Sequence, residues 1–171
     1  ACPLGLAPTS STTAALVMGD ALAMAVLNLR GFTENDFALS HPGGTLGRRL
    51  LLRVNEIMHK NDSVPIVNAT DPIKNALVEM TQKKLGMTTV INEHGKLIGV
   101  FTDGDVRRAL DNMLDLQKTL MQDVMTKKPK TIASDLLAAD ALHIMETNKI
   151  TSLVVADSDA KPIGILHIHD I

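Results

Sequence analysis

The sequence predicts a mixed α/β (α+β) fold in which two β-α-β-β-α units follow a helical N-terminal segment. Three observations predict it. The last two thirds of the chain repeat at an offset of 65 residues, so that Gly99 and Asp105 recur as Gly164 and Asp170. Each copy carries a helical apolar stripe, and two short apolar runs around a turn follow that stripe. Two such units in one chain pack against each other, because neither buries its apolar face alone.

The composition is that of an ordinary globular chain, with 171 residues of which 45% are hydrophobic and 21% charged. A net charge of −2, no Tyr or Trp and only 3 Phe argue against nucleic acid and anionic membranes as partners. The single cysteine, Cys2, rules out an internal disulfide and fits a reducing compartment. No stretch resembles a signal peptide or a membrane span, because Gly19 and Asp20 interrupt the most apolar run. We therefore expect a cytoplasmic protein.

The N-terminal segment predicts one long and one short helix. The Ser/Thr run at residues 9–13 precedes an apolar helical pattern that ends near Leu29, so these residues are candidate N-caps. Phosphate binding is the alternative reading of the same run. Gly31 is suited to a C-cap. Thr33 and Asp36 have the spacing of a capping box that opens the second helix.

The repeats begin at Val54, and the second copy is shorter by two residues in one loop. In the first copy we expect a strand over residues 64–67, a helix capped by Asp71 with Pro72 at its first position, strands over 87–92 and 97–102 around a hairpin turn, and a helix over 103–112. In the second copy we expect a strand near Thr131, a helix over residues 134–148, strands over 152–156 and 162–167, and a truncated helix at Ile168.

The candidate ligand residues follow the last strand of each copy. Gly99 permits close approach of another backbone or a ligand, and Thr102 and Asp105 lie three residues apart at a helix start. A hydroxyl at a helix N-terminus suits a phosphate, and a carboxylate suits ribose hydroxyls. The alternative is an N-capping pair that binds no ligand.

These features together resemble a tandem cystathionine-β-synthase-type (CBS) domain pair, over residues 54–113 and 114–171. The resemblance implies a cleft for an adenine nucleotide or a related ligand, with Thr102 and Asp105 at the ribose-phosphate position. The second copy keeps Gly164 and Asp170 but has His167 where Thr or Ser is usual. We therefore expect at most one conventional ligand site.

His167 and His169 form a His-x-His pattern that could bind a metal if both side chains share a strand face. No Cys or carboxylate is arranged nearby to complete a tetrahedral site, apart from the adjacent Asp170. A polar loop end between strand and helix is the alternative, and we expect no metal site.

Residues 1–53 resemble the end of a sugar isomerase (SIS) domain, a flavodoxin-like α/β fold. The resemblance rests on residues 1–12, 19–23 and 40–47, which include His41-Pro42-Gly43-Gly44. Joined to a CBS pair, this order is similar to the family of bacterial D-arabinose 5-phosphate isomerases. That family interconverts D-ribulose 5-phosphate and D-arabinose 5-phosphate on the way to 3-deoxy-D-manno-octulosonate of lipopolysaccharide or capsule.

His41 is the catalytic candidate. An aldose–ketose isomerase opens the sugar ring and moves a proton between C1 and C2, and imidazole both donates and accepts protons near neutral pH. The resemblance implies that His41 takes part in this proton transfer in the site of a neighbouring subunit. Without the resemblance, a capping histidine at a turn is the simpler reading.

The resemblance implies a C-terminal fragment of a cofactor-free, homotetrameric enzyme that acts on sugar phosphates. Because the remaining SIS segments are not in the chain, we expect the 171 residues alone to be inactive. The CBS pair is then either a sensor of a nucleotide or sugar nucleotide, or purely an oligomerisation module that dimerises through the pair.

Overall fold

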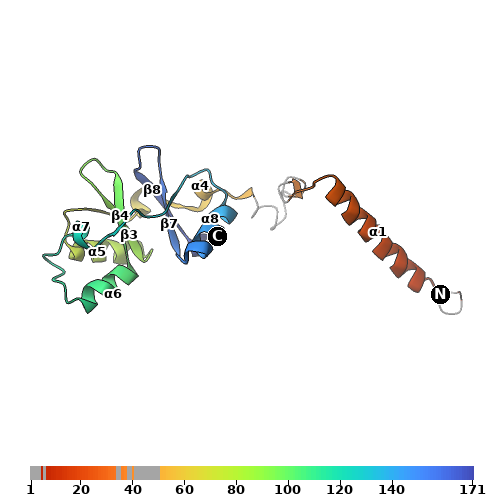
Figure 1. Cartoon of the computed structure of the whole chain (residues 1–171), viewed down its shortest axis with the longest axis horizontal. Helices are drawn as coiled ribbons and strands as arrows, with labels where there is room; N and C mark the ends of the chain where they lie inside the picture. Colours follow the sequence, from red (N-terminus) through yellow and green to blue (C-terminus); the bar gives the residue numbers. More distant parts are fainter. Residues whose placement is uncertain (1–4, 6, 34–35, 38–39, 41–50) are drawn as a thin grey trace. The chain divides into compact units, whose positions relative to one another are not determined.

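A computed structural model describes residues 5, 7–33, 36–37, 40 and 51–171. The chain divides into two compact units, Ala1–Leu50 and Leu51–Ile171 (Figure 1). The second unit holds both repeats and all of the described strands, so the predicted mixed α/β class is confirmed.

The first unit contains one long helix, α1 (Ser10–Leu29). Its end has the geometry predicted from Gly31: this residue has φ 62°, and the amides of Gly31 and Phe32 donate to the carbonyls of Asn28 and Leu27 at 3.1 Å each. This is a Schellman motif, which satisfies carbonyls that the helix leaves open. At the start, the Thr12 hydroxyl donates back to the carbonyl of Thr9 at 2.8 Å.

Helix α1 is apolar on every side, and none of its residues is buried. It runs unbroken through Gly19 and Asp20, in agreement with the single long helix predicted up to Leu29. By length and composition alone it could cross a membrane. Core helices of soluble proteins have the same length and composition, so this feature is weak evidence for a membrane span.

The predicted capping box after α1 is confirmed. The Asp36 carboxylate accepts from the backbone N–H of Thr33 at 2.8 Å and from its hydroxyl at 2.7 Å, and the Asp36 amide donates to that hydroxyl at 3.3 Å. These hydrogen bonds stabilise the ionised carboxylate, so the pKa of Asp36 lies below its ordinary value.

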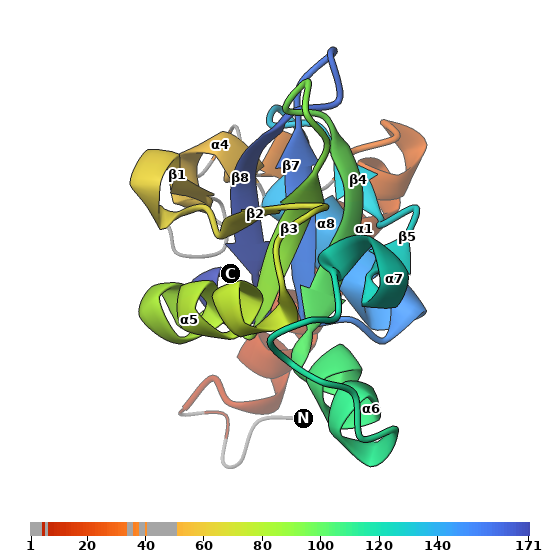
Figure 2. The ribbon, with the colours of Figure 1, turned by 90° about the vertical axis from the view of Figure 1, so that its left-hand side faces the viewer.

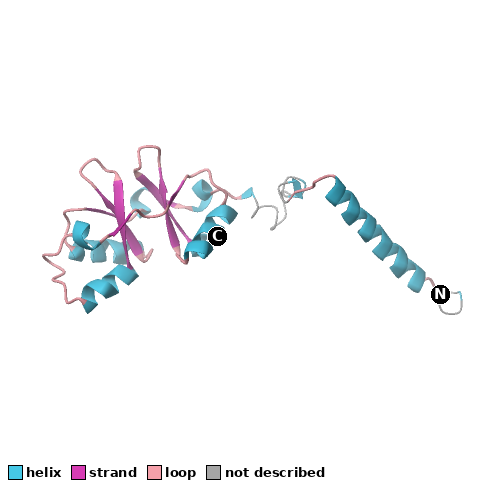
Figure 3. Cartoon of the chain, in the orientation of Figure 1, coloured by secondary structure: helices cyan, strands magenta, loops and turns pink. Residues whose placement is uncertain are grey.

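The second unit is built on two four-stranded sheets, seen as paired hairpins in Figure 3. Their strands are β1 (His59–Lys60), β2 (Ile66–Asn68), β3 (Met87–Ile91), β4 (Leu97–Thr102), β5 (Thr126–Lys127), β6 (Thr131–Ile132), β7 (Ser152–Ala156) and β8 (Pro162–His167). The helices are α4 (Val54–Ile57), α5 (Ile73–Lys83), α6 (Asp103–Asp111), α7 (Met121–Val124) and α8 (Ala138–Asn148), with 3₁₀ turns η2 (Asn61–Ser63) and η3 (Ile168–Asp170).

Each sheet takes its fourth strand from the other repeat. The sheet orders are β2-β3-β4-β5 and β1-β8-β7-β6. Strand β5 opens the second repeat but pairs antiparallel with β4, and β1 opens the first repeat but pairs antiparallel with β8. The two repeats are therefore interlocked.

The sheets of the second unit pack face to face, and helices cover their outer faces (Figure 2). Val154 and Ile165 of one sheet meet Met87 of the other in a shared cluster. Val100 also packs against this cluster. The next residues along the two strands, Phe101 after Val100 and Leu166 after Ile165, point the opposite way, because side chains alternate along a strand. Phe101 thus packs with α5 and α6, while Leu166 packs with α8.

A glycine in each long second strand receives the methionine of the exchanged segment. A Cβ on Gly99 would lie 2.5 Å from Sδ of Met125, and one on Gly164 would lie 2.6 Å from Sδ of Met58. The recurrence of both residue types therefore has a packing cause: the glycine of each repeat leaves space for the methionine of the other.

Most expected elements are confirmed, and the differences are local. Helix α5 begins at Ile73 with Pro72 at the N-cap, so the prediction of Pro72 at the first helical position was wrong. The Asp71 carboxylate instead accepts from the amide of Asn68 at 2.7 Å, which closes the preceding turn. The expected helix over residues 134–148 begins only at Ala138.

Candidate functional site

A cleft of about 530 Å³ lies in the second unit, and residues of both repeats line it. One wall is formed by the start of β3, the end of β4 and the start of α6, together with the segment around β5. The other wall is formed by the end of α8, the start of β7 and the end of β8. The lining residues include Thr102, Asp103, Gly104, Thr126, Lys128, Pro129, Lys130, Lys149, Thr151, Ser152 and His167.

Of the predicted ligand residues, the structure places Thr102 and His167 in the lining of this cleft. Gly99, Asp105 and Asp170 are not among the lining residues. Thr102 is the N-cap of α6 and His167 is the N-cap of η3. The cleft therefore brings together the residues that cap the last helix or 3₁₀ turn of each repeat, one from each sheet.

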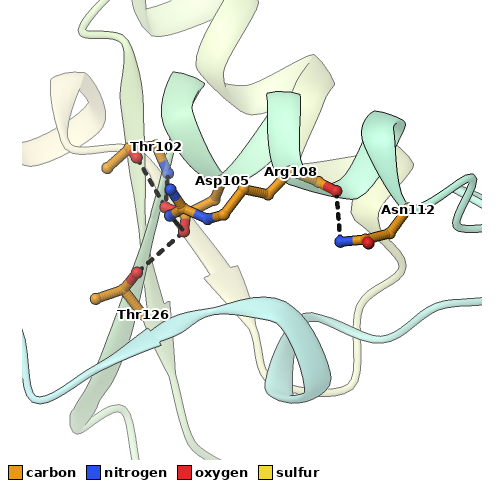
Figure 4. Close-up of polar contacts among 5 residues, drawn as sticks. All are labelled: Thr102, Asp105, Arg108, Asn112 and Thr126. Carbon is orange, nitrogen blue, oxygen red and sulfur yellow. Dashed lines mark hydrogen bonds and ion pairs between the residues drawn. The ribbon is translucent and has the colours of Figure 1, made fainter.

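Asp105 lies at the centre of a hydrogen-bond network (Figure 4). Its Oδ2 accepts from the backbone N–H of Thr102 at 2.8 Å and from the Thr102 hydroxyl at 2.7 Å. Its Oδ1 accepts from the Thr126 hydroxyl at 3.0 Å and from the Arg108 guanidinium. Because Thr126 belongs to the exchanged strand β5, this carboxylate ties helix α6 to the other repeat.

The Asp105 carboxylate is buried, with 5% of the residue exposed. Burial is the largest single influence on its pKa and acts to raise it. The hydrogen bonds from Thr102, Arg108 and Thr126 together outweigh burial, so the pKa lies below its ordinary value. Asp105 is therefore an ionised capping residue at neutral pH, which agrees with the structural alternative for the Thr102–Asp105 pair. Its role as a ribose ligand stays a prediction.

The second repeat builds the same network from histidines. Asp170 accepts from the backbone N–H of His167 at 2.8 Å and contacts Nε2 of His59 at 3.2 Å. His59 occupies the position that Thr126 has in the other copy, 67 residues later. The amide of His169 donates to Nδ1 of His167 at 3.2 Å, so this ring nitrogen replaces the capping hydroxyl of Thr102.

The pKa of His167 lies below its ordinary value. Partial burial is the main cause, and the nearby His169 and His59 add to it, while Asp170 acts in the opposite direction. The neutral imidazole suits the observed contact, because Nδ1 must be unprotonated to accept from the His169 amide.

The rings of His167 and His169 lie with their centroids 4.9 Å apart. Within the described part of the chain, no group of three or more His, Cys, Asp or Glu side chains could hold a metal ion. The His-x-His pattern is accounted for by the cap at the start of η3.

Three lysines of the cleft were not predicted from the sequence: Lys128, Lys130 and Lys149. The available signal was the run Lys127-Lys128-Pro129-Lys130 directly after the recurring Val124-Met125 pair. The predicted catalytic residue His41 and the thiol of Cys2 lie outside the described residues.

The chain matches known proteins along its whole length. The arabinose 5-phosphate isomerase KdsD of Pseudomonas aeruginosa is 58% identical over 171 residues, which are 100% of this chain and 52% of that protein. KdsD of Escherichia coli K12 is 54% identical with the same coverage. The predicted resemblance to arabinose 5-phosphate isomerases is thus confirmed, and the chain spans about half the length of these curated relatives.

Solved structures share the fold of the second unit. The Arabidopsis thaliana protein CBSX2 in complex with AMP is 28% identical, with a TM-score of 0.61 over 70% of this chain and 92% of that chain. The CBS domain protein PAE2072 of Pyrobaculum aerophilum, complexed with AMP, has a TM-score of 0.63 at 20% identity over 70% of this chain and 89% of that chain. At that identity the likeness concerns the fold alone.

The CBS domain family model matches residues 54–112 and 121–171. These two ranges are the two repeats that build the interlocked sheets. The chain belongs to the CBS domain family.

Proposed function

We propose that this chain is the regulatory part of an isomerase that interconverts D-ribulose 5-phosphate and D-arabinose 5-phosphate, and that its CBS pair binds a nucleotide-type ligand. The identity of 58% to KdsD along the full chain supports the isomerase assignment. The product would serve synthesis of 3-deoxy-D-manno-octulosonate in the cytoplasm, with sugar phosphates as substrates of the whole protein.

The observation that carries the sensor role is the cleft between the two sheets. Its volume of about 530 Å³ lies in the range of small-molecule sites. It contains the start of helix α6, where backbone N–H groups make a suitable environment for a phosphate. CBSX2, which is 28% identical, was solved with AMP.

In this proposal the residues divide into two roles. Thr102 and His167 line the cleft and are candidate ligand contacts. Gly99, Asp105, Gly164 and Asp170 position them, through methionine packing and helix capping. His41 would supply proton transfer to the isomerase site of the whole protein, which needs no cofactor.

A melting experiment with nucleosides, nucleoside monophosphates and sugar nucleotides tests the sensor role. A ligand at one hundred times its Kd stabilises the folded state by about 2.7 kcal/mol, a shift of several degrees. Thr102→Val keeps the side-chain shape and removes the hydroxyl that holds Asp105 at the start of α6, so it should reduce that shift. If no compound changes the melting temperature of the 171-residue chain, the sensor role is refuted.

The second candidate is an oligomerisation module without a ligand. It is favoured by apolar side chains exposed on α5 and α6, Val78 at 48% and Leu110 at 56%. Deleting residues 54–171 from the whole protein and measuring its mass separates the two roles. A homotetramer that falls apart supports the oligomerisation module, and a homotetramer that persists contradicts it.

The isomerase assignment has its own test. The whole protein should convert arabinose 5-phosphate, while His41→Gln should lose activity without a change in melting temperature. The purified 171-residue chain should show no turnover. Turnover by this chain alone would contradict the proposed division between catalytic and regulatory parts.

A further inference from the structure

The cleft carries more positive than negative charge. Lys128, Lys130 and Lys149 line it, and Asp103 is the one acidic residue in its lining. Among the described residues, none of the three lysine ammonium groups makes an ion pair or a hydrogen bond. The pKa of His167 is lowered, so the imidazole adds no charge near neutral pH. The cleft therefore presents unpaired cations to whatever enters it.

The lysines come from both walls of the cleft. Lys128 and Lys130 follow β5, which is paired with β4 in the first sheet. Lys149 ends helix α8, whose buried face packs on the second sheet. A single anionic group near one wall would leave the cation of the other wall unpaired, whereas two anionic groups in one ligand would satisfy both walls.

The backbone at Lys128 is a second observation. This residue has φ 55°, in the left-handed region, and the equivalent residue of the first repeat is Asn61 with φ 52°. Asparagine is enriched in this conformation, whereas a lysine there carries a cost. The turn itself therefore gives no reason for a lysine, whose side chain is instead available to the cleft that it lines.

For Lys149, by contrast, the equivalent residue of the first repeat is also a lysine. Lys149 has φ 53° at the C-cap of α8, and Lys84 has φ 59° at the C-cap of α5 in the first repeat. The two lysines share a structural position, but only Lys149 lines the cleft. Lys84 is thus a natural control for Lys149.

We propose that the cleft selects ligands with at least two anionic groups, such as the diphosphate of a nucleotide. One group contacts Lys128 and Lys130 on the first sheet, and the other contacts Lys149 at the end of α8. This inference rests on the proposed nucleotide-binding function and specifies its ligand class. A ligand of this kind bridges the two interlocked sheets and stabilises their packing.

Calorimetric titration of the 171-residue chain with adenosine, AMP and ADP, and with the matching cytidine series, tests the proposal. In at least one series the diphosphate should bind about tenfold more tightly than the monophosphate, since each charge-assisted contact contributes about one power of ten. The difference should shrink as salt is raised from 50 to 500 mM, because salt screens exposed charges.

Variants locate the effect. Lys128→Gln and Lys149→Gln should each weaken diphosphate binding about tenfold and leave nucleoside binding unchanged. Lys84→Gln, the matched control, should leave both unchanged. Equal affinity for nucleoside, monophosphate and diphosphate would overturn the charge inference while the nucleotide function stands. If no compound of either series binds, the proposed nucleotide function fails, and this inference with it.

Discussion

Each repeat has an aspartate at the equivalent position near the start of its last helix or 3₁₀ turn, but the two carboxylates have different partners. Asp105 receives hydrogen bonds from the hydroxyls of Thr102 and Thr126, whereas Asp170 contacts His59 and the backbone of His167. The Asp105 side chain is 4% exposed and the Asp170 side chain 22%. The Asp105 carboxylate is buried and accepts hydrogen bonds on both oxygens, whereas the Asp170 carboxylate is more exposed and contacts an imidazole ring.

The difference follows from what each side chain can do. A threonine hydroxyl donates and accepts at once, so Thr102 caps the helix and still donates to Asp105. The neutral imidazole of His167 uses Nδ1 to accept from the His169 amide and has no donor on that nitrogen. The two copies therefore share one architecture. Only in the copy with Thr102 is the cap independent of the protonation state of the capping side chain.

Removing each carboxylate gives the largest expected contrast. Asp105→Ala should destabilise the fold by about 1–3 kcal/mol, because Thr102, Arg108 and Thr126 lose the charged acceptor of their hydrogen bonds. Asp170→Ala should cost about 1 kcal/mol, since its network is more exposed. Urea unfolding of the two variants measures both values, and equal costs would contradict the difference between the networks.

Low pH should destabilise the wild type more than the Asp105→Ala variant. The lowered pKa of Asp105 stabilises the fold above the carboxyl's ordinary pKa of about 3.9, and this stabilisation is lost as pH falls through the lowered value. Between pH 5 and pH 2 the wild type should therefore lose more stability than Asp105→Ala. Parallel acid dependence of the two proteins would show that Asp105 is not the group responsible.

The two glycine–methionine contacts should differ in tolerance. Gly164→Ala places a Cβ 3.1 Å from the backbone oxygen of His59, as well as against Met58, and should cost about 1–3 kcal/mol. Gly99→Ala meets only the side chain of Met125 at the shortest distances and should cost less. Thermal unfolding decides the order, and a larger loss for Gly99→Ala would reverse the expectation.

Removing one hydroxyl isolates the bond between the repeats. Thr126→Val keeps the shape of the side chain and deletes its 3.0 Å hydrogen bond to Asp105. We expect a loss of about 1–2 kcal/mol, as for a hydrogen bond to a charged group. Thr131→Val, a change at an exposed strand position, is the control in the same urea assay, and the prediction fails if both variants lose equally little.

The smallest effect concerns His167. Its lowered pKa means that the unfolded chain binds the proton more readily, so stability falls as pH drops below the ordinary value of about 6.5. His167→Thr, which restores the pattern of the first repeat, should remove this term and flatten the melting temperature between pH 7.5 and 5.5 by about 1–2 °C. An unchanged slope would exclude His167 as the titrating group.

Local signals in the sequence were sufficient for much of this architecture. The Thr33–Asp36 box, the Gly31 cap and the hairpin strands follow from capping and alternation, which act over a few residues. The Thr102–Asp105 spacing predicts a capping pair in the same way, and the structure has that cap.

The exchange of β1 and β5 was not predictable in this way. Each strand has only two residues, too few to show alternation, and its partner is chosen by tertiary packing of Met58 and Met125 against the opposite glycine. The lysines of the cleft were missed for the same reason. Lys128 and Lys149 lie on different sheets, and they line one cleft only because the two repeats pack together.

We propose that the two repeats have diverged and that a ligand binds in the cleft beside Thr102, Lys128 and Lys149. Nuclear magnetic resonance of the ¹⁵N-labelled chain titrated with ADP and with cytidine diphosphate tests it most directly. We predict that a diphosphate shifts the amides of Thr102, Gly104, Lys128 and Lys149, while the equivalent positions Asn61 and Lys84 stay unchanged. Shifts centred on Asn61 and Lys84, or none at all, would contradict the account.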